Sequence, residues 1–198
     1  VRIYDYNGSA WVQAGGDING EAQSDNSGYS ISLASDGSRV AIGAIYNDGN
    51  GANSGHVRIY DYNGSAWVQV GGDIDGEASG DNSGEDVSLS SDGLSVAIGA
   101  TLNDGNGTNS GHVRIFERVN KTWIQIGDDI DGEASGDLSG SSIVLSEDGK
   151  SVAIGARKND GLNGTDSGHI RVFDYVPLLK KWIQTAGEKK LNAEEAEI

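Results

Sequence analysis

The chain has 198 residues, a formal net charge of −16 and an isoelectric point near 4.3. That charge argues against nucleic acid and anionic lipid as partners, because phosphate groups require lysine and arginine. The sequence also contains no run of about 18 apolar residues that could span a membrane. The absence of cysteine excludes disulfides, thiolate metal sites and a cysteine nucleophile. Methionine is also absent, so we expect that a leader has been removed or that the chain is a piece of a longer protein.

A repeat of 56 residues organises the chain. It separates Trp11 from Trp67 and Trp67 from Trp123, whereas the last interval, to Trp182, is longer. The extra residues fall in GLNGTDSG and DYVPLLKKW, where loops are expected. We therefore divide the chain into a half unit at 1–28, three units at 29–84, 85–140 and 141–187, and a charged tail at 188–198.

Each unit is expected to contain four short strands. In chain order they resemble DVSLS (86–90), SVAIGA (95–100), HVRIF (112–116) and WVQVG (67–71), and Asp-Gly and Asn-Gly turns favour hairpins between them. Four antiparallel strands at a fixed period are typical of a propeller blade. The sequence thus predicts an all-β fold of about three and a half blades. Since a propeller closes with about 4–8 blades, we expect further blades upstream.

The motifs resemble the FG-GAP repeat of integrin-α-type seven-bladed propellers, in a divergent form. SVAIGA, a polar loop and GHVRIF are similar to the family's apolar strand, loop and aromatic-ended strand, although Ser-Gly replaces Phe-Gly at 27–28, 83–84 and 139–140. The resemblance implies an extracellular propeller that binds ligands or partners and often calcium. The family's calcium loop does not carry over, because the single Asp36, Asp92 and Asp148 cannot supply six to eight oxygens and are expected to shape turns.

Acidic residues concentrate in the connectors between units. These read GGDINGEAQSD at 15–25, GGDIDGEASGD at 71–81 and GDDIDGEASGD at 127–137. In the shared pattern D-I-[DN]-G-E-x-x-x-D, oxygens at positions 1, 3, 5 and 9 with a glycine at 4 could wrap a hard cation. The candidate metal ligands are Asp17, Asn19, Glu21, Asp25, Asp73, Asp75, Glu77, Asp81, Asp129, Asp131, Glu133 and Asp137.

Strand alternation places the loop between the second and third strands on the same face as the connectors. Asp48, Asp104 and Asp160 in these loops are therefore additional candidate ligands. Two interpretations stay open: a bound cation that relieves the repulsion, with Ca²⁺ as the one cofactor considered, or solvated carboxylates with local hydrogen bonds. We expect Ile74 and Ala78 to anchor the connector to its blade.

Three further residue types recur with the repeat, and we expect structural roles for all of them. The histidines begin the third strands on separate blades, the arginines are expected to pair with acids or span blade interfaces, and the tryptophans are expected to pack between blades, with sugar stacking as an alternative. These residues are His56, His112 and His169; Arg2, Arg58, Arg114 and Arg171; and Trp11, Trp67, Trp123 and Trp182.

No catalytic motif is found: GxSxG, HExxH and a phosphate-binding loop are all absent. A site that repeats in every blade also argues against an enzyme, whose site is usually unique. We therefore expect a non-catalytic extracellular or surface-associated propeller that serves protein binding, adhesion or assembly. Its partner would be another protein or further repeats of the same protein. The alternatives are a carbohydrate-binding module and the non-catalytic part of a secreted enzyme.

Overall fold

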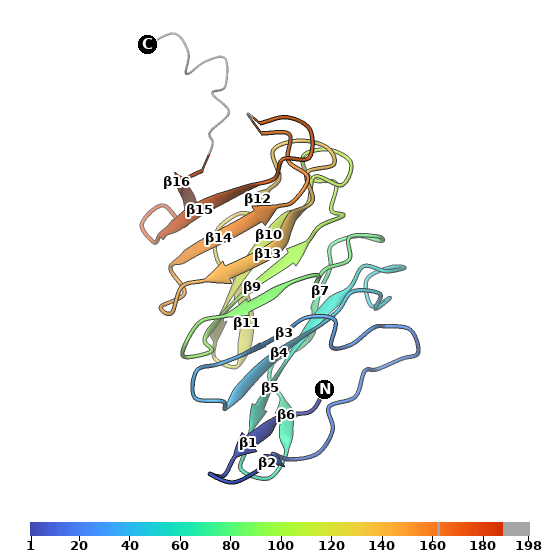
Figure 1. The fold of residues 1–198 in the computed structure, drawn as a ribbon, viewed down its shortest axis with the longest axis vertical. Helices are drawn as coiled ribbons and strands as arrows, with labels where there is room; N and C mark the ends of the chain where they lie inside the picture. The colour runs from blue at the N-terminus through green and yellow to red at the C-terminus, as the bar shows by residue number, and fades with distance from the viewer. Residues whose placement is uncertain (162, 188–198) are drawn as a thin grey trace.

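A computed structural model describes residues 1–161 and 163–187, and these residues form an all-β structure (Figure 1). No helix occurs in these two ranges, and so none is available there to cross a membrane. The sheets follow one another along the long axis of the molecule in chain order, from β1 and β2 at one end to β15 and β16 at the other.

The sheets are antiparallel, and the four main strands of each blade pair in the order in which they occur in the chain. The N-terminal hairpin consists of β1 (Tyr4–Tyr6) and β2 (Trp11–Gln13). The first full sheet consists of β3 (Ile31–Leu33), β4 (Arg39–Ala44), β5 (His56–Tyr62), β6 (Trp67–Gln69) and β7 (Ile74–Asp75). The second consists of β8 (Val87–Leu89), β9 (Ser95–Ala100), β10 (His112–Val119), β11 (Thr122–Gln125) and β12 (Ile130–Asp131). The third consists of β13 (Ser139–Leu145), β14 (Ser151–Ala156), β15 (His169–Val176) and β16 (Lys181–Ala186).

The fold class predicted from the repeat is confirmed. The described residues form three four-stranded blades preceded by the outer hairpin of another, as the sequence predicts. The N-terminal hairpin and the first two full sheets begin and end within the predicted units, whereas β13 of the third sheet begins at Ser139, before the expected boundary after residue 140. The predicted charged tail at 188–198 lies outside the described residues.

The connector is more ordered than a plain loop. After β6, residues Ile74 and Asp75 form β7, which pairs with Val57 and His56 at the start of β5. β12 pairs with β10 in the same way. The connector therefore first continues the outer edge of its own blade and then crosses to the next. Ile74 is buried, as expected of an anchor, but the expectation for Ala78 was wrong. The Ala78 side chain is exposed. The connector is held at this residue by the backbone N–H, which donates a hydrogen bond to Asp81 Oδ2 at 3.0 Å.

The apolar core lies between successive blades. One cluster joins Val57 and Ile59 of β5 to Val96 and Ile98 of β9, and a second cluster repeats this arrangement between the second and third blades. Burial of these branched side chains between the faces of two sheets is the main stabilising contribution to blade stacking. Neither blade interface consists of apolar residues alone, however.

The tryptophan in the fourth strand of each full blade makes a hydrogen bond to the preceding sheet. The Nε1 atoms of Trp67, Trp123 and Trp182 donate to backbone carbonyls of the preceding sheet at 2.8, 2.9 and 2.8 Å. Trp11 has no preceding sheet in the described chain, and 69% of its surface is exposed. The three bonded tryptophans thus pack between blades as predicted from the repeat.

Candidate functional site

The connectors and the loops between the second and third strands meet at one edge of the blades. The Asn50 side chain donates from Nδ2 to the carbonyls of Gly76 and Glu77, both at 2.9 Å. Asn106 makes the equivalent bonds to Gly132 and Glu133. Most of the candidate ligands named from the sequence therefore lie along a single acidic edge, although they do not share one site.

The last aspartate of each connector has a structural environment. Asp81 is buried, and its Oδ2 accepts hydrogen bonds from the Ala78 backbone N–H and from Asn103 Nδ2, each at 3.0 Å. Asp25 and Asp137 accept the equivalent bonds. Because Asn103 belongs to the next blade, this aspartate ties the connector to the loop of the following blade. Buried carboxylates are stabilised by such bonds.

The third connector position and the loop aspartates also serve local structure. The backbone carbonyls of Asn19, Asp75 and Asp131 accept bonds from the Nη2 atoms of Arg58, Arg114 and Arg171 at 2.9, 2.6 and 2.6 Å. These bonds cross between units, as expected for the arginines. In the loops, Oδ1 of Asp48, Asp104 and Asp160 accepts the backbone N–H of Asn53, Asn109 and Asp166 at 2.8, 2.7 and 2.9 Å.

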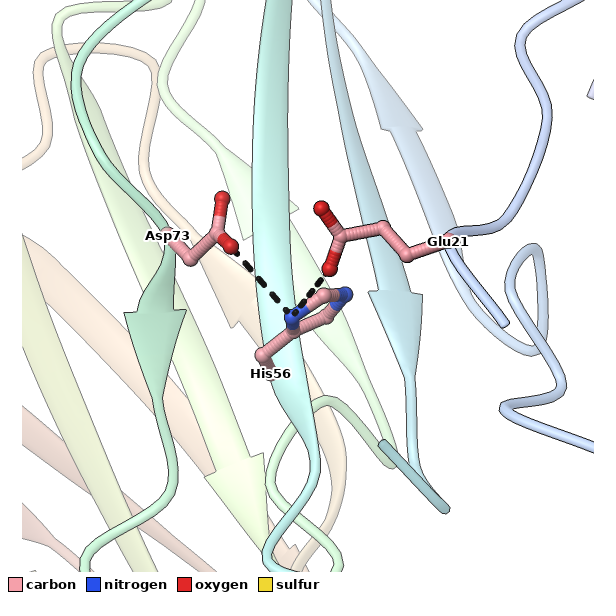
Figure 2. Close-up of side chains that lie close together, drawn as sticks. All are labelled: Glu21, His56 and Asp73. Atoms are coloured by element: carbon pink, nitrogen blue, oxygen red, sulfur yellow. Dashed lines mark ion pairs between the residues drawn. The ribbon is translucent and has the colours of Figure 1, made fainter. Parts of the chain in front are cut away.

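Glu21, His56 and Asp73 converge from three parts of the chain (Figure 2). Glu21 belongs to the first connector, His56 begins β5, and Asp73 immediately precedes β7 on the same blade. The His56 Nδ1 atom lies 3.9 Å from Glu21 Oε2 and 3.9 Å from Asp73 Oδ2. We call this set the first His-carboxylate cluster.

The next blade repeats the arrangement with Glu77, His112 and Asp129, the second His-carboxylate cluster. His112 Nδ1 lies 3.7 Å from Glu77 Oε2 and 3.8 Å from Asp129 Oδ2. In the third blade His169 Nδ1 lies 3.7 Å from Glu133 Oε2. The position equivalent to Asp73 in that blade is 188, outside the described residues.

The remaining connector aspartate, Asp17, has a different partner. It accepts two hydrogen bonds from Arg2, from Nε and from Nη2, both at 3.0 Å. The position that would carry the histidine of this unit falls before residue 1, so the described chain offers no third member here. The sequence placed Asp17 and Asp73 in one class, and the structure separates them by their neighbours.

Burial controls the protonation of both clusters. The imidazoles of His56 and His112 are each 1% exposed. Burial lowers the pKa of His56, and burial together with the nearby Arg114 guanidinium lowers the pKa of His112 to about 4. Burial also raises the pKa of the Glu77 carboxyl. The rings are therefore neutral at pH 7, although carboxylate oxygens lie on two sides of each.

The sequence interpretation missed the histidines as members of the site. It assigned them structural roles because they recur on separate blades. The available signal was their register: β7 pairs Asp75 with His56, and this pairing brings the start of the connector beside the histidine. The four oxygens of a single connector do not face one centre, because Asp73 joins the first cluster and Glu77 the second.

A small cleft lies beside each cluster, between the connector and the next blade. The cleft of about 270 Å³ is lined by Asp73, Asp75, Arg114, Phe116 and Trp123 among others, and an equivalent cleft of about 220 Å³ recurs one blade later. The Arg114 guanidinium lies over the Phe116 ring at 5.4 Å. Each cleft thus combines carboxylates with a fixed cation and an apolar wall.

Comparisons with known proteins agree with this architecture. Residues 74–116 match the model of the FG-GAP repeat, from β7 to the aromatic residue of β10. A 6-phosphogluconolactonase-like protein from Bacteroides uniformis superposes with a TM-score of 0.63 at 14% identity, over 93% of this chain and 47% of that chain. A similar protein from Bacteroides fragilis gives 0.54 at 15% identity, over 80% of this chain and 38% of that one.

At these identities the structural matches show the fold alone, and the chain spans less than half the length of either protein. A comparison with curated protein sequences found no match. The family match covers most of one connector, the first two strands of the next blade and most of its histidine-bearing third strand, and the same pattern recurs before and after it in the sequence. Residues 74–116 match the FG-GAP repeat, and they lie within a chain of four-stranded β-propeller blades.

Proposed function

We propose that this chain is a non-catalytic propeller segment that binds another protein, at the cell surface or outside the cell, in adhesion or assembly. The observation that carries the proposal is the repetition of one acidic edge from blade to blade. Exposed loop aspartates Asp48, Asp104 and Asp160 follow one another at equivalent positions, each beside a connector that carries further carboxylates.

Repetition favours binding over catalysis. A catalytic centre brings different groups together at one place, whereas here the same groups occur at equivalent places in successive blades. A series of equivalent sites on a rigid scaffold suits a partner that makes several contacts at once. The FG-GAP match supports the same function, because the family resemblance implies propellers that bind partners.

The charge of the edge defines the partner. An edge rich in Asp and Glu, on a chain with a net charge of −16, is complementary to a protein surface rich in lysine and arginine. Attraction between exposed charges weakens with salt, because the Debye length shortens from about 10 Å at 0.1 M to about 3 Å at 1 M. Binding should therefore weaken as the salt concentration rises.

Sugar stacking receives no support from the tryptophans of the complete blades. Trp123 and Trp182 are buried, and Trp67 is partly buried, with each indole N–H bonded to the preceding sheet. At 8% and 9% exposure, Trp123 and Trp182 leave little ring surface on which a glycan could stack. Protein binding therefore remains our proposal.

The test uses two variants with the same change of charge on opposite edges. Asp48→Asn/Asp104→Asn/Asp160→Asn neutralises the loop edge and keeps the Oδ1 acceptors. Asp36→Asn/Asp92→Asn/Asp148→Asn does the same in the turns of the other edge, where Oδ1 accepts the backbone N–H two residues on.

The labelled chain is applied to intact cells of the source organism, with and without protease treatment of the cell surface. We expect saturable, protease-sensitive binding that weakens at least tenfold in the loop-edge variant and less than twofold in the turn-edge variant. Equal weakening in both variants would show that binding depends on net charge alone, and it would contradict the loop edge as the binding surface. Absence of saturable binding would overturn the function.

A further inference from the structure

We propose that the two His-carboxylate clusters are binding sites for a divalent transition metal ion of the zinc class, each made by two consecutive connectors and the histidine between them. This inference does not concern the calcium loop of the family. The clusters use connector carboxylates of the acidic edge, but the inference does not rest on the proposed function. Its first basis is the convergence of one imidazole nitrogen and two carboxylate oxygens within 4.8 Å of one another, in two successive blades.

The second basis is an unsatisfied nitrogen. The Nδ1 atoms of His56 and His112 are buried and have no hydrogen-bond partner among the described residues. The carboxylate oxygens nearest to them, at 3.7–3.9 Å, lie beyond hydrogen-bond distance. A buried polar atom without a partner is costly, and here the same atom is unpartnered at equivalent places in both blades.

The third basis is the orientation of the two carboxylates. Glu21 presents Oε1 to Arg58 Nη1 at 3.3 Å and Oε2 to the histidine. Asp73 accepts the Gln69 side-chain amide on Oδ1 at 2.5 Å and presents Oδ2 to the histidine. In each carboxylate one oxygen is held by a neighbour, so the other faces the ring. Groups that orient ligands in this way are typical of metal sites.

The second cluster repeats this division of oxygens. Glu77 presents Oε1 to Arg114 Nη1 at 3.6 Å and Oε2 to His112. Asp129 accepts the Gln125 amide on Oδ1 at 2.6 Å and presents Oδ2 to His112. The arrangement thus recurs in successive blades down to the choice of oxygen, so the repeat preserves the geometry of the whole centre and not only its residue types.

The chemistry of the centre selects a cation. An imidazole nitrogen without a hydrogen-bond partner and two carboxylate oxygens are all electron-pair donors, and Arg58 or Arg114 neutralises one side only. One nitrogen and two oxygen ligands suit zinc and its neighbours, whereas calcium requires six to eight oxygens.

The spacing is close to that of a bound ion. Ligand atoms around tetrahedral zinc lie about 2.0–2.1 Å from the metal and hence roughly 3.3–3.4 Å from one another. Each histidine–carboxylate pair must close by about 0.5 Å from 3.9 Å, and the two carboxylate oxygens, within 4.8 Å of each other, by at most about 1.4 Å. The Glu21 and Asp73 side chains are 44% and 31% exposed, which leaves room for this movement. Three protein ligands leave the fourth position of a tetrahedral ion for water or for a donor from a partner.

The experiment is calorimetric titration of the chelator-treated chain with ZnCl₂ at pH 7.5. Glu21→Gln/Asp73→Asn replaces two partly exposed side chains and should leave folding intact. Asp36→Asn/Asp92→Asn is the matched control, because it removes two carboxylates from the opposite edge. We expect the zinc stoichiometry to fall by one in the cluster variant and to stay unchanged in the control.

A thermal measurement supports the titration. At zinc about one hundred times above Kd, each site should raise Tm by about 5–10 °C in a chain of this size, and the cluster variant should lose one such increment. His56→Ala should also lose one site if it folds, and where it does not, the carboxylate variant decides. The proposal is overturned if the wild-type chain shows no saturable zinc binding, or if Glu21→Gln/Asp73→Asn binds as much zinc with the same affinity.

Discussion

Replacing Gly99 by alanine should destabilise the chain, whereas the same replacement at Gly155 should not, although both glycines lie in the identical hexapeptide SVAIGA. The difference is the neighbouring blade. A Cβ on Gly99 would overlap the Gly140 carbonyl oxygen, and it would lie 3.1 Å from the carbonyl carbon and 3.0 Å from Ile143 Cδ1. A Cβ on Gly155 would meet its nearest described atoms, in Ser142, at 3.5 Å.

The magnitude follows from these contacts. Carbon atoms pack best at about 3.5–4.0 Å, so the second and third blades would have to separate by about 0.5 Å or more at the mutated Gly99. Overpacking of this kind costs about 1–3 kcal/mol, against a gain of about 0.5–1 kcal/mol for removing a glycine from a strand. We expect a net loss of about 1–2 kcal/mol for Gly99→Ala and no loss, or a gain of about 0.5 kcal/mol, for Gly155→Ala.

Thermal unfolding followed by circular dichroism measures the difference. About 2–4 °C of Tm corresponds to 1 kcal/mol in a domain of this size, so Gly99→Ala should melt roughly 2–8 °C below the wild-type chain, and Gly155→Ala at or slightly above it. Urea unfolding should give the same order. Equal losses in both variants would show that the strand itself requires glycine and that the close approach of Gly99 and Gly140 is not the cause.

Two further predictions concern blade contacts and pH. Trp123→Phe should lower the free energy of unfolding by about 2 kcal/mol, because the Val70 carbonyl loses the indole N–H that donates to it. Trp11→Phe should change the free energy of unfolding by less than about 0.5 kcal/mol, because Trp11 is exposed. Urea unfolding measures both variants, and equal losses would contradict a stabilising role for the hydrogen bond between blades. Burial raises the pKa of Asp86 above its ordinary 3.8, so its stabilising contribution is complete below that pH and is lost as pH rises through the folded pKa. The stability difference between wild type and Asp86→Asn should therefore fall with rising pH. The pKa of Asp36 is lowered mainly by hydrogen bonds from Ser38, so the stability difference between wild type and Asp36→Asn should rise with pH. Unfolding measured at pH 3–7 tests both variants. The same direction of change with pH for Asp86→Asn and Asp36→Asn would refute the opposite pKa shifts of the two aspartates.

Most of the fold could be predicted from the sequence because it depends on local, repeated signals. The second strand was predicted at 95–100 and lies at Ser95–Ala100, since a buried alternating strand between two turns carries its own boundaries. The connector was less predictable. Its pairing with β5 depends on a kink at Gly71, with a φ of 80°, that returns the chain to its own blade at Ile74. No local propensity indicates that pairing.

The candidate site was harder to predict, because its members belong to different repeats. Asp73 and Glu77 are four residues apart, and this spacing predicts two ligands of one ion. In the structure Gly76 crosses between them so close to Ser54 that any Cβ would overlap the Ser54 carbonyl oxygen, and the two carboxylates point to different blades. The glycine at position 4 is thus explained by this backbone crossing and does not require a loop that wraps a metal.

The origin of each cluster also determines how many can form. One cluster requires the glutamate of one connector, the histidine of the next third strand and the aspartate of the connector that follows, as in Glu21, His56 and Asp73. No single 56-residue unit contains this set in the right place, and a cluster exists only where blades stack in register. Zinc binding at these positions would therefore report on assembly of the propeller as well as on its side chains, because separating two blades would remove the glutamate from the other two ligands.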